Sequence, residues 1–273
     1  MVADPYEPFR LAAQRTHSRG IFFGFMAAYY RSFAVPHVAK QLVEHGEILR
    51  NPDKRASDTG IVIYEVIQGG FDSPRATSMV ELLRRVHRRV VGSSDDYMFA
   101  LVSQLVTPVR FTRTYGRTPL AHDVVEAGVA FYTELGSRMG IAGLPRTFAE
   151  WEEFHNTFEN EHVAQSVEGL LLMERALPGF RARLPAPMRW LGARVLSAAM
   201  QSAAVSEALG LPVPERVGQA VLKVMTGRGG SRETDFFVPG QSSRSYPLGY
   251  GLGDVGPESR SLGAADSEQE SAR

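Results

Sequence analysis

The stretch 77–91, TSMVELLRRVHRRVV, decides how the fold of this chain is interpreted. Apolar residues occur at positions −8, −4, −1 and +3 relative to His87, and in an α-helix these positions share one face. They are Met79, Leu83, Val86 and Val90. The spacing therefore predicts an α-helix whose apolar stripe carries His87 toward the core.

A buried imidazole needs a partner. Burying it costs about 1–3 kcal/mol unless its nitrogens are bonded, so the site should hold an acceptor, a metal or both. Arg84 and Arg88, at −3 and +1, border the stripe and are candidates for binding the same group as His87. From this helix alone, the favoured interpretation is a core histidine bonded to a carbonyl or carboxylate, with the arginines on a solvated face.

A second pair of residues lies on the helix predicted before this one. Arg55 and Thr59 are four residues apart and so share a face of that helix. The turn that begins at Gly69 and Gly70 would let the two helices pack as an antiparallel pair, with Arg55 and Thr59 near His87. An arginine, a hydroxyl and an imidazole around one cavity could serve a haem with its carboxylates, or bound oxygen. An ordinary solvated pair is equally open at this point.

The hydrophobic periodicity on both sides of these two predicted helices is also that of α-helices. From residue 36 to about 225 apolar residues recur at helical spacing, and the breaks carry Gly, Pro or Asp. The predicted helices are 37–49, 53–68, 75–91, 95–114, 120–139, 147–175, 187–208 and 214–226. We expect an all-α domain over 1–226. Residues 227–273, with nine Gly, eight Ser and three Pro, predict a largely disordered tail.

Composition limits the function. Lys and Arg total 30 and so do Asp and Glu, so no basic surplus favours a nucleic-acid partner. The chain has no cysteine, which excludes disulfides, iron–sulfur clusters and thioether-linked haem. Any metal must be held by His, Asp, Glu or a cofactor.

The sequence gives no sign of export or of membrane insertion. The first ten residues, MVADPYEPFR, lack the order of a signal peptide, and the apolar run 21–30 is about half of the ~20 residues needed to span a bilayer. We expect a cytoplasmic protein with at most peripheral membrane contact, and the absence of cysteine fits a reducing compartment.

The order of short motifs supports a family resemblance over about residues 10–225. The first half contains Pro36, R-x-x-x-T at 55–59, GG at 69–70, RRVHRRVVG at 84–92 and Tyr97. The second half contains LVTPVRF at 105–111, YGRTPL at 115–120, RMGI at 138–141 and LPRTF at 144–148. The chain resembles the oxygenase family that includes MpaB and the latex-clearing rubber oxygenases, and looks closer to the MpaB branch.

The resemblance implies a globin-like bundle of about eight helices around a non-covalent b-type haem. It implies that His87 is the proximal iron ligand and that Arg55 and Thr59 lie close to the haem. The implied reaction is activation of O₂ and oxidation or cleavage of a C=C bond in an isoprenoid or other unsaturated apolar substrate.

Asp58 is a departure from the rubber-cleaving pattern, in which a lysine just before the threonine can serve as a distal haem ligand. A carboxylate would act differently on the distal face, so we count Asp58 with Arg55 and Thr59 as a catalytic candidate. A small isoprenoid or lipid is then a better substrate prediction than rubber.

Two other functions stay open. One is a non-catalytic haem-binding or lipid-binding protein of the same fold. The other is a di-iron carboxylate oxidase, suggested by two E-x-x-H patterns at 152–155 and 159–162. Di-iron bundles draw such motifs from separate helices, whereas these stack along one helix over ~10 Å. A polar helix face with ordinary charge pairs is therefore the favoured interpretation of 152–162.

Overall fold

A computed structural model describes residues 4–44, 47–50, 52–87 and 92–227. Within these ranges the chain forms thirteen α-helices and no strand, so the all-α prediction is confirmed. The helices are α1 (Glu7–Leu11), α2 (Ser18–Arg31), α3 (Pro36–Glu44), α4 (Glu47–Arg50), α5 (Pro52–Gly69), α6 (Pro74–His87), α7 (Ser94–Tyr115), α8 (His122–Met139), α9 (Phe148–His162), α10 (Val167–Ala182), α11 (Gly192–Met200), α12 (Ala203–Ala208) and α13 (Arg216–Gly227).

The predicted count of about eight helices is too low because three predicted helices are divided and because α1 and α2 precede the first predicted helix. The predicted helix 147–175 is in fact α9 and α10. Ala164 donates its backbone N–H to the Ala34 carbonyl at 3.0 Å, which directs the chain out of α9. Ser166 then caps α10 by accepting the Gly169 N–H at 3.0 Å. Pro178 does not end α10, which continues to Ala182.

The predicted helix 187–208 is also divided. It consists of the 3₁₀ segment η3 (Ala186–Leu191), α11 and α12. Gln201 adopts the left-handed conformation, with φ of 55°, and Ser202 caps α12 by accepting the Val205 N–H. Neither this break nor the one before α10 carries Gly or Pro, so neither was visible in the pattern.

Other predicted boundaries need smaller changes. The predicted helix 37–49 is α3 and α4. In the described residues α6 ends at His87, and residues 88–91 of the predicted helix lie outside the described ranges. The predicted tail lies outside them too, except for Gly227, the last residue of α13.

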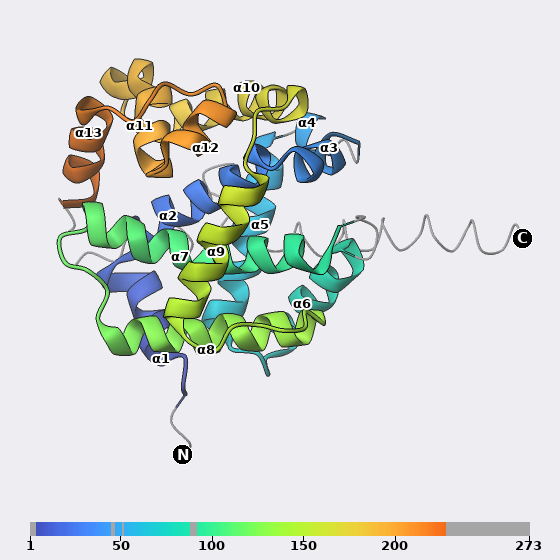
Figure 1. Ribbon diagram of the computed structural model, residues 1–273. Coiled ribbons are helices and arrows are strands. Elements are labelled where there is room, and N and C mark those ends of the chain that lie inside the picture. The colour runs from blue at the N-terminus through green and yellow to red at the C-terminus, as the bar shows by residue number, and fades with distance from the viewer. Residues whose placement is uncertain (1–3, 45–46, 51, 88–91, 228–273) are drawn as a thin grey trace, which may run out of the picture.

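Two helices that are distant in the sequence, α2 and α7, cross at the centre of the molecule (Figure 1). Gly20 and Gly24, one turn apart on α2, face Thr112 and Pro108 of α7. A Cβ atom built at Gly24 would lie 2.3 Å from the Pro108 Cα atom. Only glycine allows the two backbones to approach this closely.

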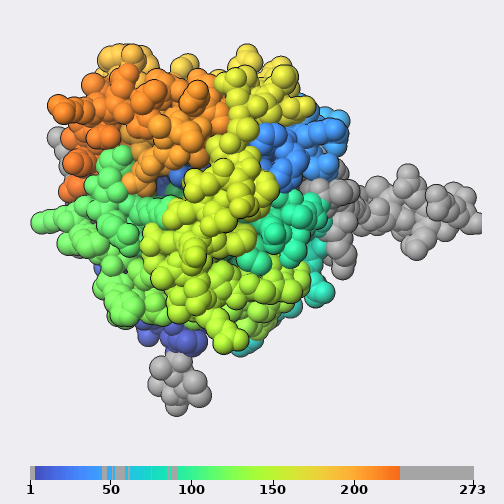
Figure 2. Space-filling view, viewed as in Figure 1, coloured from blue at the N-terminus to red at the C-terminus, as the bar shows by residue number. Residues whose placement is uncertain are grey.

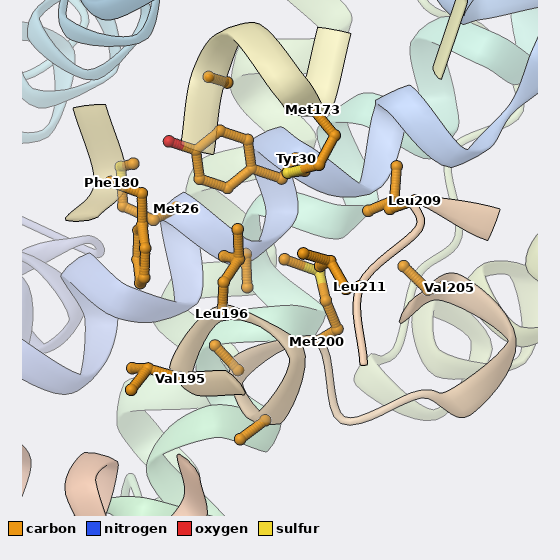
Figure 3. Packing of buried hydrophobic residues seen from close by; sticks show 14 of the residues in the cluster. Met26, Tyr30, Met173, Phe180, Val195, Leu196, Met200, Val205, Leu209 and Leu211 are labelled. Carbon is orange, nitrogen blue, oxygen red and sulfur yellow. The ribbon is translucent and has the colours of Figure 1, made fainter. Parts of the chain in front are cut away.

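The crossing joins two apolar cores. One core is built by α1, α5, α6, α7 and α8, and α2 contributes Ile21 to it. The other is built around α2 by α10, α11 and α12, where Met26 and Tyr30 pack beside Met173 and Leu196 (Figure 3). In Figure 1, α9 runs across the front of α7, from α8 toward α10. None of the described helices combines the length and the apolar character that crossing a bilayer requires.

Candidate functional site

The predicted pair of helices that carries Thr59 and His87 is present. α5 and α6 pack against each other and are joined by a tight turn. Gly70 takes a φ of 69° in this turn, and Ser73 accepts the Ala76 N–H at 3.1 Å. Thr59 lies ten residues before the end of α5 and His87 thirteen residues after the start of α6, so in an antiparallel pair their positions along the helix axes differ by about one helical turn.

His87 is the last described residue of α6 and is half-buried, with its Nδ1 atom buried. Its ring lies 5.1 Å from the Tyr97 ring, and the Tyr97 hydroxyl donates to the His87 carbonyl at 2.9 Å. Burial raises the pKa of Tyr97 above its usual range, and nearby Asp96 adds to this. Tyr97 therefore stays a neutral donor and holds the end of α6 against the first turn of α7.

For the other predicted site residues the structure gives the position in the chain, but not the contacts of the side chain. Arg55 and Asp58 lie on the α5 backbone, within one turn before Thr59. Arg84 is exposed on α6. Arg88 lies outside the described residues. The structure thus brings α5 and the end of α6 together, while the side-chain roles of these four residues stay predictions.

An apolar pocket opens beside Thr59. It is small, with a volume of about 30 Å³, enough for a water molecule or two but not for a whole substrate or porphyrin without rearrangement. Its walls come from three helices: Thr59, Gly60 and Ile63 of α5, Phe22, Phe25, Met26 and Tyr29 of α2, and Gln104 of α7. The walls are mainly apolar, and Thr59, Tyr29 and Gln104 are the polar side chains among them.

His155 on α9 is a residue whose burial the sequence interpretation missed. It is fully buried, and its ring lies 5.3 Å from Phe99 of α7. Trp151, Phe154 and Phe158 stand at −4, −1 and +3 relative to it. The same spacing predicted that His87 points toward the core. That spacing was a usable signal, hidden by the glutamates between these residues.

The glutamates of α9 pair with arginines from other helices. Glu159 accepts from the Nε atom of buried Arg31 of α2, whose Nη2 atom donates to the Met200 carbonyl at 2.7 Å. Glu152 accepts from Arg110 of α7 at 2.9 Å. The predicted charge pairs are confirmed, but the face is not wholly polar, because it includes His155.

The E-x-x-H residues do not gather as di-iron ligands in the described ranges. Glu159 lies 3.8 Å from the Nδ1 atom of His155, and both Glu152 and Glu159 are engaged by arginines. No group of three or more His, Asp or Glu side chains converges on one point among the described residues.

We expect acid to destabilise the protein through His155. Burial, followed by the charges of Arg31 and Arg110, holds the pKa of His155 well below its usual 6.5. The folded protein keeps this ring neutral at a pH where the unfolded chain binds a proton. Below about pH 6.5 the free energy of unfolding should therefore fall by up to about 1.4 kcal/mol per pH unit, with no His155 contribution well above that pH.

Urea denaturation across this pH window measures the effect. His155→Phe should flatten the slope whatever its effect on stability at neutral pH. His122→Phe is the matched control, because the His122 side chain is 90% exposed. Equal slopes in wild type and His155→Phe would contradict the prediction.

Comparisons with known proteins agree with the all-α fold. A family model described as "ER-bound oxygenase mpaB/B'/Rubber oxygenase, catalytic domain" matches residues 14–228, without distinguishing the MpaB branch from the rubber oxygenases. A solved structure, "Structure of Latex Clearing Protein LCP in the closed state", superposes with a TM-score of 0.62 at 17% identity. The match covers 91% of this chain and 73% of that one, and at this identity it shows the fold. A search of curated proteins found no match.

Proposed function

The chain belongs to the catalytic-domain family of the ER-bound mpaB/B′ oxygenases and rubber oxygenases, and from this membership we propose that it is a haem-dependent oxygenase. Its substrate would be an isoprenoid or another unsaturated apolar molecule, oxidised or cleaved at a C=C bond. The observation that carries the proposal is the packing of α5, whose Thr59 lines a small apolar cavity, against α6, which carries His87.

The residues present suit a non-covalent b-type haem. His87 offers an imidazole at the end of α6, and a neutral imidazole is a common axial ligand of haem iron. The chain has no cysteine for thioether attachment. The side chains that line the small cavity beside Thr59 are mainly apolar, as a porphyrin face prefers. Arg84, Arg88 and Arg55 are the cations that would pair with the haem carboxylates.

When bound, haem would supply the activation of molecular oxygen. Phe22, Phe25 and Met26 would exclude water from the reacting region. The Thr59 hydroxyl can hydrogen-bond to a polar atom held in the pocket, and the Gln104 amide can orient a polar end of the substrate. Tyr97 would fix His87 through its bond to the His87 carbonyl.

Asp58 supports a small substrate within this proposal. It stands just before Thr59, where the rubber-cleaving pattern has a lysine.

The test is the absorption spectrum of the purified protein with haem supplied. A Soret band is expected, and His87→Ala should weaken haem binding by about one to two orders of magnitude and shift the band. His122→Ala, at an exposed position, should leave both unchanged.

Four outcomes would overturn parts of the proposal. Absence of a Soret band would reject haem binding, and two irons per chain without porphyrin would favour the di-iron alternative. Haem binding with no O₂ consumption on a panel of isoprenoids would favour a non-catalytic carrier. A spectrum unchanged in His87→Ala would assign the iron to another ligand.

A further inference from the structure

The segment that joins α10 to α11 carries a tryptophan in an unusual setting. The Trp190 side chain, on η3, is 70% exposed, whereas Trp151 is fully buried. The indole N–H of Trp190 donates to the Pro187 carbonyl at 3.0 Å, which orients the ring. The exposed residues before it are Arg181, Ala182, Pro185, Ala186, Pro187 and Arg189. A large apolar ring is thus held in solvent among small apolar residues and arginines.

The same segment has a one-sided charge. Residues 175–206 contain five arginines and no Asp or Glu. Arg194 is neutralised by Glu215 at 3.0 Å. Arg189 donates only to backbone carbonyls, those of Leu184 and Ala182. Within the described part of the chain, neither Arg181 nor Arg189 forms an ion pair.

Exposed tryptophan beside exposed arginine matches the chemistry of a lipid–water interface. An indole prefers the headgroup level of a bilayer, where its ring is in apolar surroundings and its N–H stays satisfied. Guanidinium groups bind phosphate and carboxylate groups of anionic lipids. The gold segment between α10 and α11 lies at the upper edge of the molecule (Figure 1 and Figure 2), so a flat surface can reach it.

We propose that residues 181–190, here called the Trp190 edge, seat the protein on the surface of an anionic membrane. A protein partner fits these observations less well, because a standard interface needs about 800 Å² from each side and the Trp190 edge is one short segment with a single large apolar side chain. The proposal does not rest on the oxygenase activity, although a membrane is where an apolar substrate would accumulate.

The full chain can be tested with vesicles of phosphatidylcholine, with and without phosphatidylserine. Sedimentation should show binding to the phosphatidylserine vesicles, and binding should weaken as salt is raised. The tryptophan emission should shift to the blue on binding, and the shift reports Trp190 because Trp151 is already buried.

Variants at the edge should weaken binding by measurable factors. Trp190→Ala should lower the partition coefficient by about tenfold or more, as expected for loss of an inserted aromatic side chain. Arg181→Gln and Arg189→Gln should each lower it about fivefold. Gln keeps the part of the Arg181 stem that packs on Gly192.

Two matched controls test whether the location matters. Val167→Ala removes an apolar side chain that is 80% exposed at the other end of α10, ~22 Å from Ala182. Arg117→Gln removes an exposed arginine on another loop. Both should bind like wild type. Equal binding to both vesicle types, retained binding in Trp190→Ala, or a change of oligomeric state in Trp190→Ala without lipid would each overturn the proposal.

Discussion

Gly24→Val is expected to lower the free energy of unfolding by about 3 kcal/mol or more, the upper end of the usual cost of overpacking. A Cβ atom at Gly24 would lie 2.3 Å from the Pro108 Cα atom and 2.8 Å from its backbone nitrogen. These are main-chain atoms, so no rotamer change relieves the contact and α2 must move away from α7. Thermal or urea denaturation measures the loss, which is a large part of the ~5–15 kcal/mol that stabilises a typical domain.

The comparison of two glycine-to-alanine changes isolates the cause. Alanine stabilises a helix by up to about 1 kcal/mol relative to glycine where there is space for it. At Gly227, where no atom lies within 4 Å of the built Cβ, Gly227→Ala should be neutral or slightly stabilising. Gly24→Ala should be clearly destabilising. Similar small effects at both positions would mean that the α2–α7 crossing tolerates separation.

The second large effect is expected at the buried ion pair. Glu159→Ala leaves the Arg31 guanidinium, 4% exposed, without its carboxylate. Removing one partner of a buried pair costs about 3–5 kcal/mol, because the remaining charge is uncompensated. Urea denaturation at neutral pH should show this loss, whereas Glu134→Ala in the half-exposed pair with Arg138 should cost no more than about 1 kcal/mol.

The double variant Arg31→Met with Glu159→Leu separates charge from packing. Without a lone charge, its stability should lie well above that of Glu159→Ala and close to wild type. A double variant as unstable as Glu159→Ala would show that the methylene groups and the bond to the Met200 carbonyl, not the charge, are what matter.

The sequence was sufficient for the helical class and for the α5–α6 pair. The glycines at 69 and 70 marked the turn, and the stripe of His87 identified a helix whose Met79 and Leu83 do pack against the core. The breaks at 163–166 and 201–202 could not be predicted. One depends on a hydrogen bond between Ala164 and Ala34, residues 130 positions apart in the sequence.

Of the residues that line the pocket beside Thr59, only those on α5 could be predicted from the sequence. Thr59 was selected because of its spacing from Arg55, but Phe22, Phe25 and Gln104 reach the pocket from helices far away in the sequence. His155 was missed for a different reason. It belongs to the first of the two E-x-x-H patterns, which suggested metal chemistry, and the apolar residues at −4, −1 and +3 were not given the weight they had received around His87.

The α2–α7 crossing also has a consequence for how the chain becomes folded. α2 supplies Ile21 to one core and Met26 to the other, so the two cores share a single wall. During synthesis the glycine face of α2 stays uncovered until α7 has emerged. The contact between α2 and α7 is therefore non-local in the sequence and slow to form. Neither core can close alone, and we expect the helical body to fold and unfold in one cooperative transition.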